Sequence, residues 1–230
     1  MSQTNVHRGH VLVTGASSGI GAAIAARLVH DGWEVTGFDR SDPTIDDPRF
    51  SSLKIDLLDA DDVRSALHPL KLNAFVHAAG FMHVGELGRL DLAAGADMWR
   101  LNVGVAMLLA DTLAPSLPRG GRIVLIGSRT ASGAAGRSQY VATKSALVGM
   151  ARSWAMELAP RGITVNVVSP SATKTPMLRD PGRSGVPPRL PPIGRFVQPE
   201  EVAALTAFLL SQEAAAITGQ QIVICGGSSL

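Results

Sequence analysis

Cysteine, charge and aromatic residues are scarce in this sequence. Cys225 is the single cysteine, so the chain cannot close an internal disulfide, and it lacks ligands spaced for a metal site. Only 17% of the residues are Asp, Glu, Lys or Arg, the net charge is +2, and no cluster of Lys and Arg has the form that binds a phosphate backbone. We therefore expect no metal and no nucleic-acid partner.

Long hydrophobic runs are missing as well. No uninterrupted apolar stretch reaches the roughly 18 residues of a membrane-spanning helix, and Met1 to Gly9 lack the apolar core of a signal peptide. The hydrophobic content of 46% still provides for a large buried core. These features predict a soluble, cytoplasmic protein with no membrane partner. No break in composition divides residues 1–230, so we expect one domain.

Short apolar runs alternate with helical patterns along the chain. A β-rich run at 10–14 meets Gly15, helical spacing follows from Ile20 to Leu28, and a second strand at 34–38 comes next. The two strands of such a unit are parallel and joined by a right-handed crossover. The alternation predicts an α/β fold with one doubly wound parallel sheet and helices on both faces. Further strands are expected at 53–55, 74–78, 122–126, 163–168 and 221–225.

Two stretches break this alternation. Residues 40–52 contain Pro43, Pro48 and several acidic residues, so we expect a loop there without a stable helix. Residues 176–199 hold half of the 14 prolines, which indicates a substrate loop or a disordered segment.

Two helical segments, at 98–114 and 141–159, are apolar nearly all round. A helix that covers one sheet face needs a single apolar stripe, so a second stripe requires another partner. We expect a homo-oligomer, a dimer or tetramer, through these helices. The alternative is that long alanine-rich helices are simply apolar.

A glycine-rich turn joins the first strand to the first helix. Binding a pyrophosphate there requires a tight turn, close backbone approach and free N–H groups at the positive end of a helix, which residues without a Cβ allow. The spacing Gly-x-x-x-Gly-x-Gly inside a strand–helix–strand unit predicts a dinucleotide site, with a turn needed only for packing as the alternative. The residues concerned are Gly15, Ser17, Ser18, Gly19, Ile20 and Gly21.

Asp39 ends the second strand and is followed by Arg40. A carboxylate at this position can accept hydrogen bonds from both ribose hydroxyls of an adenosine and repels a 2′-phosphate, which favours NAD over NADP. Arg40 keeps NADP open, because an arginine here can pair with a phosphate or stack on adenine.

Tyr140 is the single tyrosine, and Lys144 follows it by four residues, so the two share one face of a helix. Lowering the pKa of a phenol from near 10 to about 7, where it can act as a base, takes roughly 4 kcal/mol. A cation about 4 Å away at an effective dielectric constant of about 20 supplies that much. The pair therefore indicates an acid/base couple, with a core aromatic beside a solvated lysine as the alternative.

From Val11 to the C-terminus, these motifs and their order resemble the short-chain dehydrogenase/reductase family. The resemblance implies a Rossmann-type sheet of about seven strands in the order 3-2-1-4-5-6-7, and hydride transfer between a nicotinamide cofactor and a secondary alcohol or ketone. It implies that Tyr140 is the general acid/base and that Lys144 lowers its pKa and holds the nicotinamide ribose. It also implies that Ser128 binds the substrate oxygen and that Asn102 anchors a proton-relay water. The remaining implied cofactor contacts are Asp56, Leu57, Ala78, Ala79, Gly80, Pro170, Thr173 and Thr175.

Several features depart from the family pattern. Ser128 precedes Tyr140 by 12 residues, one fewer than is commonest in the family. His77 stands where the family has an asparagine, and we expect it to be a satisfied residue at a strand end rather than a catalytic base. Ser171 replaces the usual glycine after Pro170. A short segment after the second strand is shared with members that oxidise cyclic diols, which hints at a cyclic substrate.

The Pro-rich loop carries four arginines, Arg179, Arg183, Arg189 and Arg195. One hypothesis is that the loop folds over the substrate and that an arginine favours a carboxylate or another anion. The alternative is a solvated loop whose arginines contact water or neighbouring subunits.

Two functions remain open for this chain. The first is an NAD(H)-dependent alcohol dehydrogenase or carbonyl reductase, and the second is a sensor or scaffold that binds the cofactor without turnover. The presence of Asn102, Ser128, Tyr140 and Lys144 favours the enzyme, because a retired enzyme has no physical need for all four.

Overall fold

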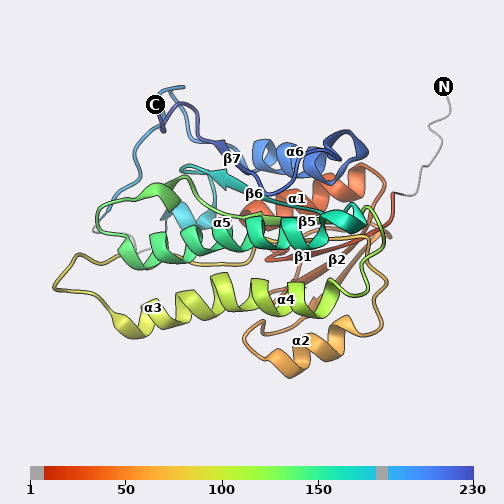
Figure 1. The fold of residues 1–230 in the computed structure, drawn as a ribbon. Helices are drawn as coiled ribbons and strands as arrows, with labels where there is room; N and C mark the ends of the chain where they lie inside the picture. The colour runs from red at the N-terminus through yellow and green to blue at the C-terminus, as the bar shows by residue number, and fades with distance from the viewer. Residues whose placement is uncertain (1–7, 180–185) are drawn as a thin grey trace.

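The computed structural model describes residues 8–179 and 186–230, and within them the chain forms one parallel sheet of seven strands (Figure 1). The strand order is β3-β2-β1-β4-β5-β6-β7, so the fold class and the order expected from the sequence are both confirmed. The strands are β1 (His10–Thr14), β2 (Glu34–Asp39), β3 (Phe50–Lys54), β4 (Ala74–His77), β5 (Arg122–Ile126), β6 (Thr164–Pro170) and β7 (Gln221–Ile224).

Helices cover both faces of the sheet (Figure 1). One hydrophobic cluster joins α1 and α6 to the sheet, and a second cluster on the other face joins α2, α4 and α5 to it. Across the described ranges, no helix is both long and apolar enough to cross a membrane. The helices are α1 (Gly19–His30), α2 (Ala60–Leu67), α3 (Leu92–Trp99), α4 (Val105–Leu113), α5 (Ser138–Leu158) and α6 (Pro199–Leu210).

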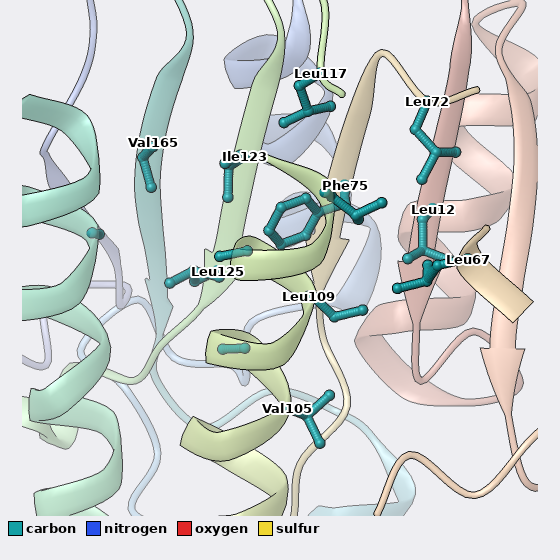
Figure 2. Packing of buried hydrophobic residues seen from close by; sticks show 14 of the residues in the cluster. Leu12, Leu67, Leu72, Phe75, Val105, Leu109, Leu117, Ile123, Leu125 and Val165 are labelled. Atoms are coloured by element: carbon teal, nitrogen blue, oxygen red, sulfur yellow. The ribbon is translucent and has the colours of Figure 1, made fainter. Parts of the chain in front are cut away.

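Alternate residues of the central strands enter opposite halves of the core. Leu12 of β1 packs on the side of α2, α4 and α5, whereas Val11 and Val13 pack toward α1 and α6. Figure 2 shows Leu12 together with Phe75 of β4 and Leu109 of α4 in the first half. All three are fully buried, and burying a side chain of this size contributes about 1.5–3 kcal/mol. The central strands are therefore held firmly, and so are the residues at their carboxyl ends.

The third strand begins earlier than the sequence predicts. β3 runs from Phe50 to Lys54 rather than over 53–55, so the predicted loop at 40–52 ends at residue 49. The reason is that β3 is an edge strand with mostly exposed side chains and has no apolar run to mark its start. Between β2 and β3, where the structure describes every residue, there is no helix, as expected.

The helix predicted at 98–114 is longer and is interrupted. It begins at Leu92, where the Asp91 side chain caps it by accepting a hydrogen bond from the main-chain N–H of Ala94 at 3.0 Å. A π-helical turn, Arg100–Gly104, then separates α3 from α4. Hydrophobic periodicity does not reveal such a turn, because one extra residue shifts the pattern only locally. The other apolar helix, α5, begins at Ser138 instead of residue 141.

The segments that follow β1, β4 and β5 reach the same edge of the sheet, because these three strands are parallel neighbours. In Figure 1 the loops after β4 and β5 extend to the left of the view, on the opposite side from the N-terminus. In open sheets of this kind, ligands bind at the carboxyl ends of the strands. The candidate site lies there.

Candidate active site

The glycine-rich turn after β1 has the shape of a phosphate cradle. Gly15 adopts a left-handed conformation (φ +72°), and a Cβ on it would lie 2.9 Å from the main-chain nitrogen of Ala79. A Cβ on Gly21 would collide with the main-chain oxygen of Gly15, so this position also requires glycine. Ser18 precedes α1 in an extended conformation, and its side chain does not cap the helix. The first N–H groups of α1 are thus presented to a ligand, as an anion site at a helix N-terminus requires.

Asp39 lies beside this turn at the end of β2. Its carboxylate accepts hydrogen bonds from the main-chain N–H groups of Ser17 and Ser41, both at 3.1 Å. Burial alone raises the pKa of Asp39, but the hydrogen bonds from Ser17, Ser41 and Arg40 outweigh it and hold the pKa below its ordinary value. The carboxylate is therefore ionised at neutral pH. Arg40 is exposed next to it.

His77 is locked into the centre of the sheet. Its Nδ1 lies 2.9 Å from the hydroxyl oxygen of Thr14, which also accepts hydrogen bonds from the N–H groups of Ala78 and Ala79 at 3.1 Å. Burial, followed by the charge of Lys144, lowers the pKa of His77 to about 3, so His77 is neutral at neutral pH. Its Nδ1 is engaged with Thr14 and does not face the cavity, and its Nε2 is buried without a hydrogen-bond partner among the described residues.

Asn102 connects the loop after β4 to α5. It lies fully buried in the π-helical turn, where its Oδ1 accepts a hydrogen bond from Phe81 N–H and its Nδ2 donates to Phe81 O, both at 3.2 Å. Nδ2 also donates to the hydroxyl of Thr143 at 3.1 Å, and that hydroxyl donates to the carbonyl of Tyr140 at 2.8 Å. A Cβ on Gly80 would lie 2.6 Å from Asn102 Oδ1. The side chain of Asn102 thus fixes the loop after β4 and α5 relative to each other.

Tyr140 and Lys144 lie one turn apart on α5 and are both buried. The Lys144 ammonium is 5.8 Å from the centroid of the Tyr140 ring and donates a hydrogen bond to the main-chain oxygen of Ile126 at 2.8 Å. Burial lowers the pKa of Lys144 to about 8. The Tyr140 ring packs against Met82 and Met98, so its position is set by the core.

Ser128 follows β5 and faces the same space. Its hydroxyl lies 2.8 Å from that of Thr130 and accepts a hydrogen bond from Thr130 N–H at 3.2 Å. This contact caps the 3₁₀ turn Arg129–Ser132 and fixes the orientation of Ser128. The serine is buried beside the cavity rather than at the open surface.

A cavity of about 610 Å³ lies at this edge of the sheet. The predicted residues that line it come from the turn after β1, the loops after β4, β5 and β6, and α5; they are Ile20, Ala78, Gly80, Ser128, Tyr140, Lys144, Pro170, Thr173 and Thr175. Thr175 also lies against the glycine-rich turn, 3.3 Å from where a Cβ of Gly19 would be. The cavity thus runs from the cradle to the tyrosine.

Other predicted residues lie outside the cavity wall. Asp39 and Arg40 stand at the end of β2, and Asp56 is exposed after β3. The Leu57 side chain is buried in the core, which leaves only its main chain to reach a cofactor. Asn102 lies behind Gly80.

The arginines of the Pro-rich loop divide into three groups. Arg189 is exposed and lines the cavity. Arg179 is exposed without lining it, and Arg195 forms an ion pair with Glu201 (2.7 Å) at the start of α6 instead. The fourth, Arg183, lies outside the described residues. The sequence did not single out Arg129 and Arg137, which also line the cavity; the available signal was that both lie in the segment between Ser128 and Tyr140.

Among the described residues, no cluster of histidine, cysteine, aspartate and glutamate is arranged to hold a metal ion. A parallel sheet with a phosphate cradle after β1 and a buried serine, tyrosine and lysine around one cavity defines a Rossmann-type oxidoreductase site. The cradle, the ionised carboxylate of Asp39 beside it and the cavity that runs from the cradle to Tyr140 fit a nicotinamide dinucleotide.

Comparisons with known proteins agree with this class. Residues 15–229 match the family model described as Enoyl-(Acyl carrier protein) reductase. The chain is 36% identical to 2,3-dihydro-2,3-dihydroxybenzoate dehydrogenase of Escherichia coli, over 96% of this chain and 97% of that one. It is 35% identical to 3-oxoacyl-[acyl-carrier-protein] reductase FabG of Salmonella typhimurium, over 94% and 95%.

A solved structure, aldohexose dehydrogenase of Thermoplasma acidophilum, superposes with a TM-score of 0.88 at 28% identity, covering 96% of this chain and 93% of that one. The chain belongs to the short-chain dehydrogenase/reductase family. It is therefore an oxidoreductase of a family that uses a nicotinamide cofactor.

Proposed function

We propose that this chain is an NAD(H)-dependent oxidoreductase that interconverts a secondary alcohol and a ketone, with Tyr140 as general acid/base. The observation that carries the proposal is the position of this single tyrosine: it lies with Ser128 and Lys144 on one cavity that reaches the phosphate cradle. A tyrosine needed only for the core would have no reason to face that cavity.

The residues of the chain divide the proton chemistry among them. When bound, the nicotinamide ring supplies or accepts the hydride. Ser128 hydrogen-bonds the reacting oxygen, and its orientation is set beforehand by Thr130. Tyr140 takes the proton of an alcohol, or gives its own proton to the oxygen of a ketone as charge develops there.

Lys144 makes the phenol a usable base. The ammonium lies 5.8 Å from the centroid of the Tyr140 ring, where a positive charge favours the phenolate over the neutral phenol. The hydrogen bond to Ile126 holds the ammonium in place, and this charge also binds the nicotinamide ribose in our proposal. Asn102 acts by positioning, through the hydrogen bonds that hold the loop after β4 against α5, and in this proposal it also anchors the water that relays protons from Lys144 to solvent.

We propose NAD rather than NADP as the cofactor. Asp39 is ionised and lies at the end of β2 beside the cradle. There its carboxylate can accept hydrogen bonds from the ribose hydroxyls of the adenosine and repels a 2′-phosphate. The contacts proposed for the adenine side are Asp56 and the main chain of Leu57, with Ala79 and Gly80 at the adjacent ribose. Thr173 and Thr175 are proposed to position the carboxamide and the phosphates.

The substrate we propose is a small, cyclic alcohol or ketone with an anionic group. The cavity of about 610 Å³ suits a small molecule beside the nicotinamide. The similar Escherichia coli dehydrogenase acts, by its name, on 2,3-dihydro-2,3-dihydroxybenzoate, which is a cyclic diol with a carboxylate. The short connection between β2 and β3 agrees with the hint that the sequence provides for cyclic diols.

We also propose that the enzyme is a homo-oligomer through α4 and α5. Met107 on α4 and Met156 on α5 are exposed, and Trp99 at the end of α3 is half exposed. A second copy covering these side chains would bury them. Met156→Glu should then reduce the mass measured by light scattering, whereas Met156→Leu should not.

A nucleotide-binding sensor is the second candidate function. It is favoured by one relative, a cyclic-di-GMP-binding biofilm dispersal mediator protein of Escherichia coli that is 35% identical over 94% of this chain. A sensor of this kind would bind a nucleotide in the same cavity without turnover.

The experiment that tests the proposal is a panel of secondary alcohols, cyclic diols and ketones, run with NAD(H) and NADP(H) and followed by the absorbance of the reduced nicotinamide. The enzyme proposal predicts turnover of at least one class, faster with NAD(H). NADH binding without turnover of any substrate would support the sensor function and contradict the proposed dehydrogenase function.

A further inference from the structure

The cavity is lined by positive charge. Its described lining includes Arg129, Arg137, Lys144 and Arg189, and no side chain of aspartate or glutamate among the residues that the structure describes. Opposite charges in a partly buried site attract strongly, because little water screens them there. A neutral substrate has no need of this arrangement, whereas an anionic one matches it.

The four cations are not equivalent. Lys144 already donates to the carbonyl of Ile126, and Arg137 donates to the carbonyl of Val186 at 3.4 Å. Arg189 is exposed to solvent at the rim. Arg129 is half-buried, and its Nε, like that of Arg137, is buried with no hydrogen-bond acceptor among the described residues. Unlike Arg137, Arg129 makes no side-chain hydrogen bond to the described main chain.

A buried N–H without an acceptor is costly, by about 1–3 kcal/mol. This cost is removed when the Arg129 guanidinium turns toward the cavity and a ligand there supplies the acceptor, and the planar guanidinium matches a carboxylate in a two-point hydrogen bond. Arg129 and Ser128, which we propose holds the reacting oxygen, line the same cavity. One molecule in this cavity can therefore place an anionic group at Arg129 and its reacting oxygen at Ser128.

We propose that Arg129 is the specificity-determining residue of the substrate pocket and binds a carboxylate that the substrate carries apart from its reacting carbon. This proposal rests on the proposed oxidoreductase function and narrows its substrates to oxo acids and hydroxy acids of small size. The sequence suggested that an arginine of the Pro-rich loop binds a substrate anion; in this proposal Arg129 does so instead. Of the loop arginines, Arg195 is already paired with Glu201.

The turnover test uses two substrate pairs, acetoacetate with its methyl ester and 4-oxocyclohexane-1-carboxylate with its methyl ester, each reduced with NADH. The quantity compared is the ratio of kcat/KM for the acid to kcat/KM for the ester. A lost hydrogen bond to a charged group predicts that Arg129→Gln lowers this ratio about 10- to 100-fold, and that Arg129→Lys restores part of it. Arg195→Gln is the matched control, because Arg195 is an arginine outside the cavity and should leave the ratio as in wild type.

A binding test separates this proposal from the proposed function. Titrating the same oxo acids into Tyr140→Phe with NADH, by isothermal calorimetry, measures carboxylate binding without turnover. Binding that Arg129→Gln weakens about 10-fold or more in this background supports the inference even if the wild type turns nothing over. An acid/ester ratio or a carboxylate affinity that Arg129→Gln leaves unchanged, or the absence of carboxylate binding, overturns it even if ketones are reduced. Circular dichroism of each variant shows whether it is folded. If Arg129→Gln is misfolded, Arg129→Lys takes its place: a lower ratio of kcat/KM for the acid to kcat/KM for the ester than in wild type supports the inference, and an unchanged ratio overturns it.

Discussion

The Lys144 ammonium lies 5.8 Å from the centre of the Tyr140 ring and donates a hydrogen bond to the main-chain oxygen of Ile126 at the end of β5. The cation is therefore held by the sheet rather than left to solvent. Because α5 presents both side chains on one face, the sheet and the helix together set the distance between the charge and the phenol.

Tyr140→Phe should lower kcat by about 10²- to 10⁴-fold, the usual contribution of a general acid/base. Phenylalanine keeps the packing against Met82 and Met98, so folding and cofactor binding should change little. Turnover of the best ketone from the panel measures the first effect, and titration of NADH by fluorescence measures the second. A variant with nearly wild-type kcat would show that Tyr140 is a core aromatic.

Lys144→Met should impair both kcat and NADH binding, and it should also alter how stability depends on pH. Burial lowers the pKa of Lys144 from 10.5 to about 8, so the unfolded chain binds more protons than the folded one between these values. The free energy of unfolding of the wild type should therefore rise, relative to Lys144→Met, by about 2 kcal/mol between pH 7.5 and 9.5. Urea unfolding at both pH values measures the difference, and parallel curves would contradict it.

His77→Asn should make the protein less sensitive to acid. The pKa of His77 is lowered from 6.5 to about 3, mainly by burial, so the unfolded chain binds the extra proton between these values and stability falls as the pH drops. Between pH 7 and 4.5 the free energy of unfolding of the wild type should fall by roughly 2–3 kcal/mol more than that of His77→Asn. His68→Asn, at an exposed position, serves as the control and should follow the wild type.

Asp39→Ser should shift the cofactor preference toward NADP. Removing the ionised carboxylate at the end of β2 removes both the acceptor for the ribose hydroxyls and the repulsion of a 2′-phosphate. The ratio of kcat/KM with NADH to that with NADPH should fall by about 10-fold or more, or about 1.4 kcal/mol. Asp42→Asn removes an exposed carboxylate from the neighbouring loop and should leave the ratio in place. An equal ratio in Asp39→Ser and wild type would mean that another group selects the cofactor.

The local patterns of the sequence determined much of the fold. Apolar runs separated by helical spacing predict the parallel sheet, and the motifs that resemble the family imply its strand order. The glycine spacing and the four-residue interval between Tyr140 and Lys144 depend only on near neighbours in the chain. Such patterns can be recognised in the sequence because side-chain direction repeats every 3.6 residues in a helix and every two residues in a strand.

Only the tertiary structure determined the features of the site that depend on contacts between residues distant in the sequence. The hydrogen bond between Thr14 and His77 joins residues that are 63 positions apart in the chain. The hydrogen bond between Asn102 and Thr143 joins residues that are 41 positions apart. The edge strand β3 and the π-helical turn have no periodic signal of their own. Local spacing does not encode which arginines line the cavity. Arg129, Arg137 and Arg189 line it and Arg195 does not, because loop packing and the ion pair of Arg195 with Glu201 decide this.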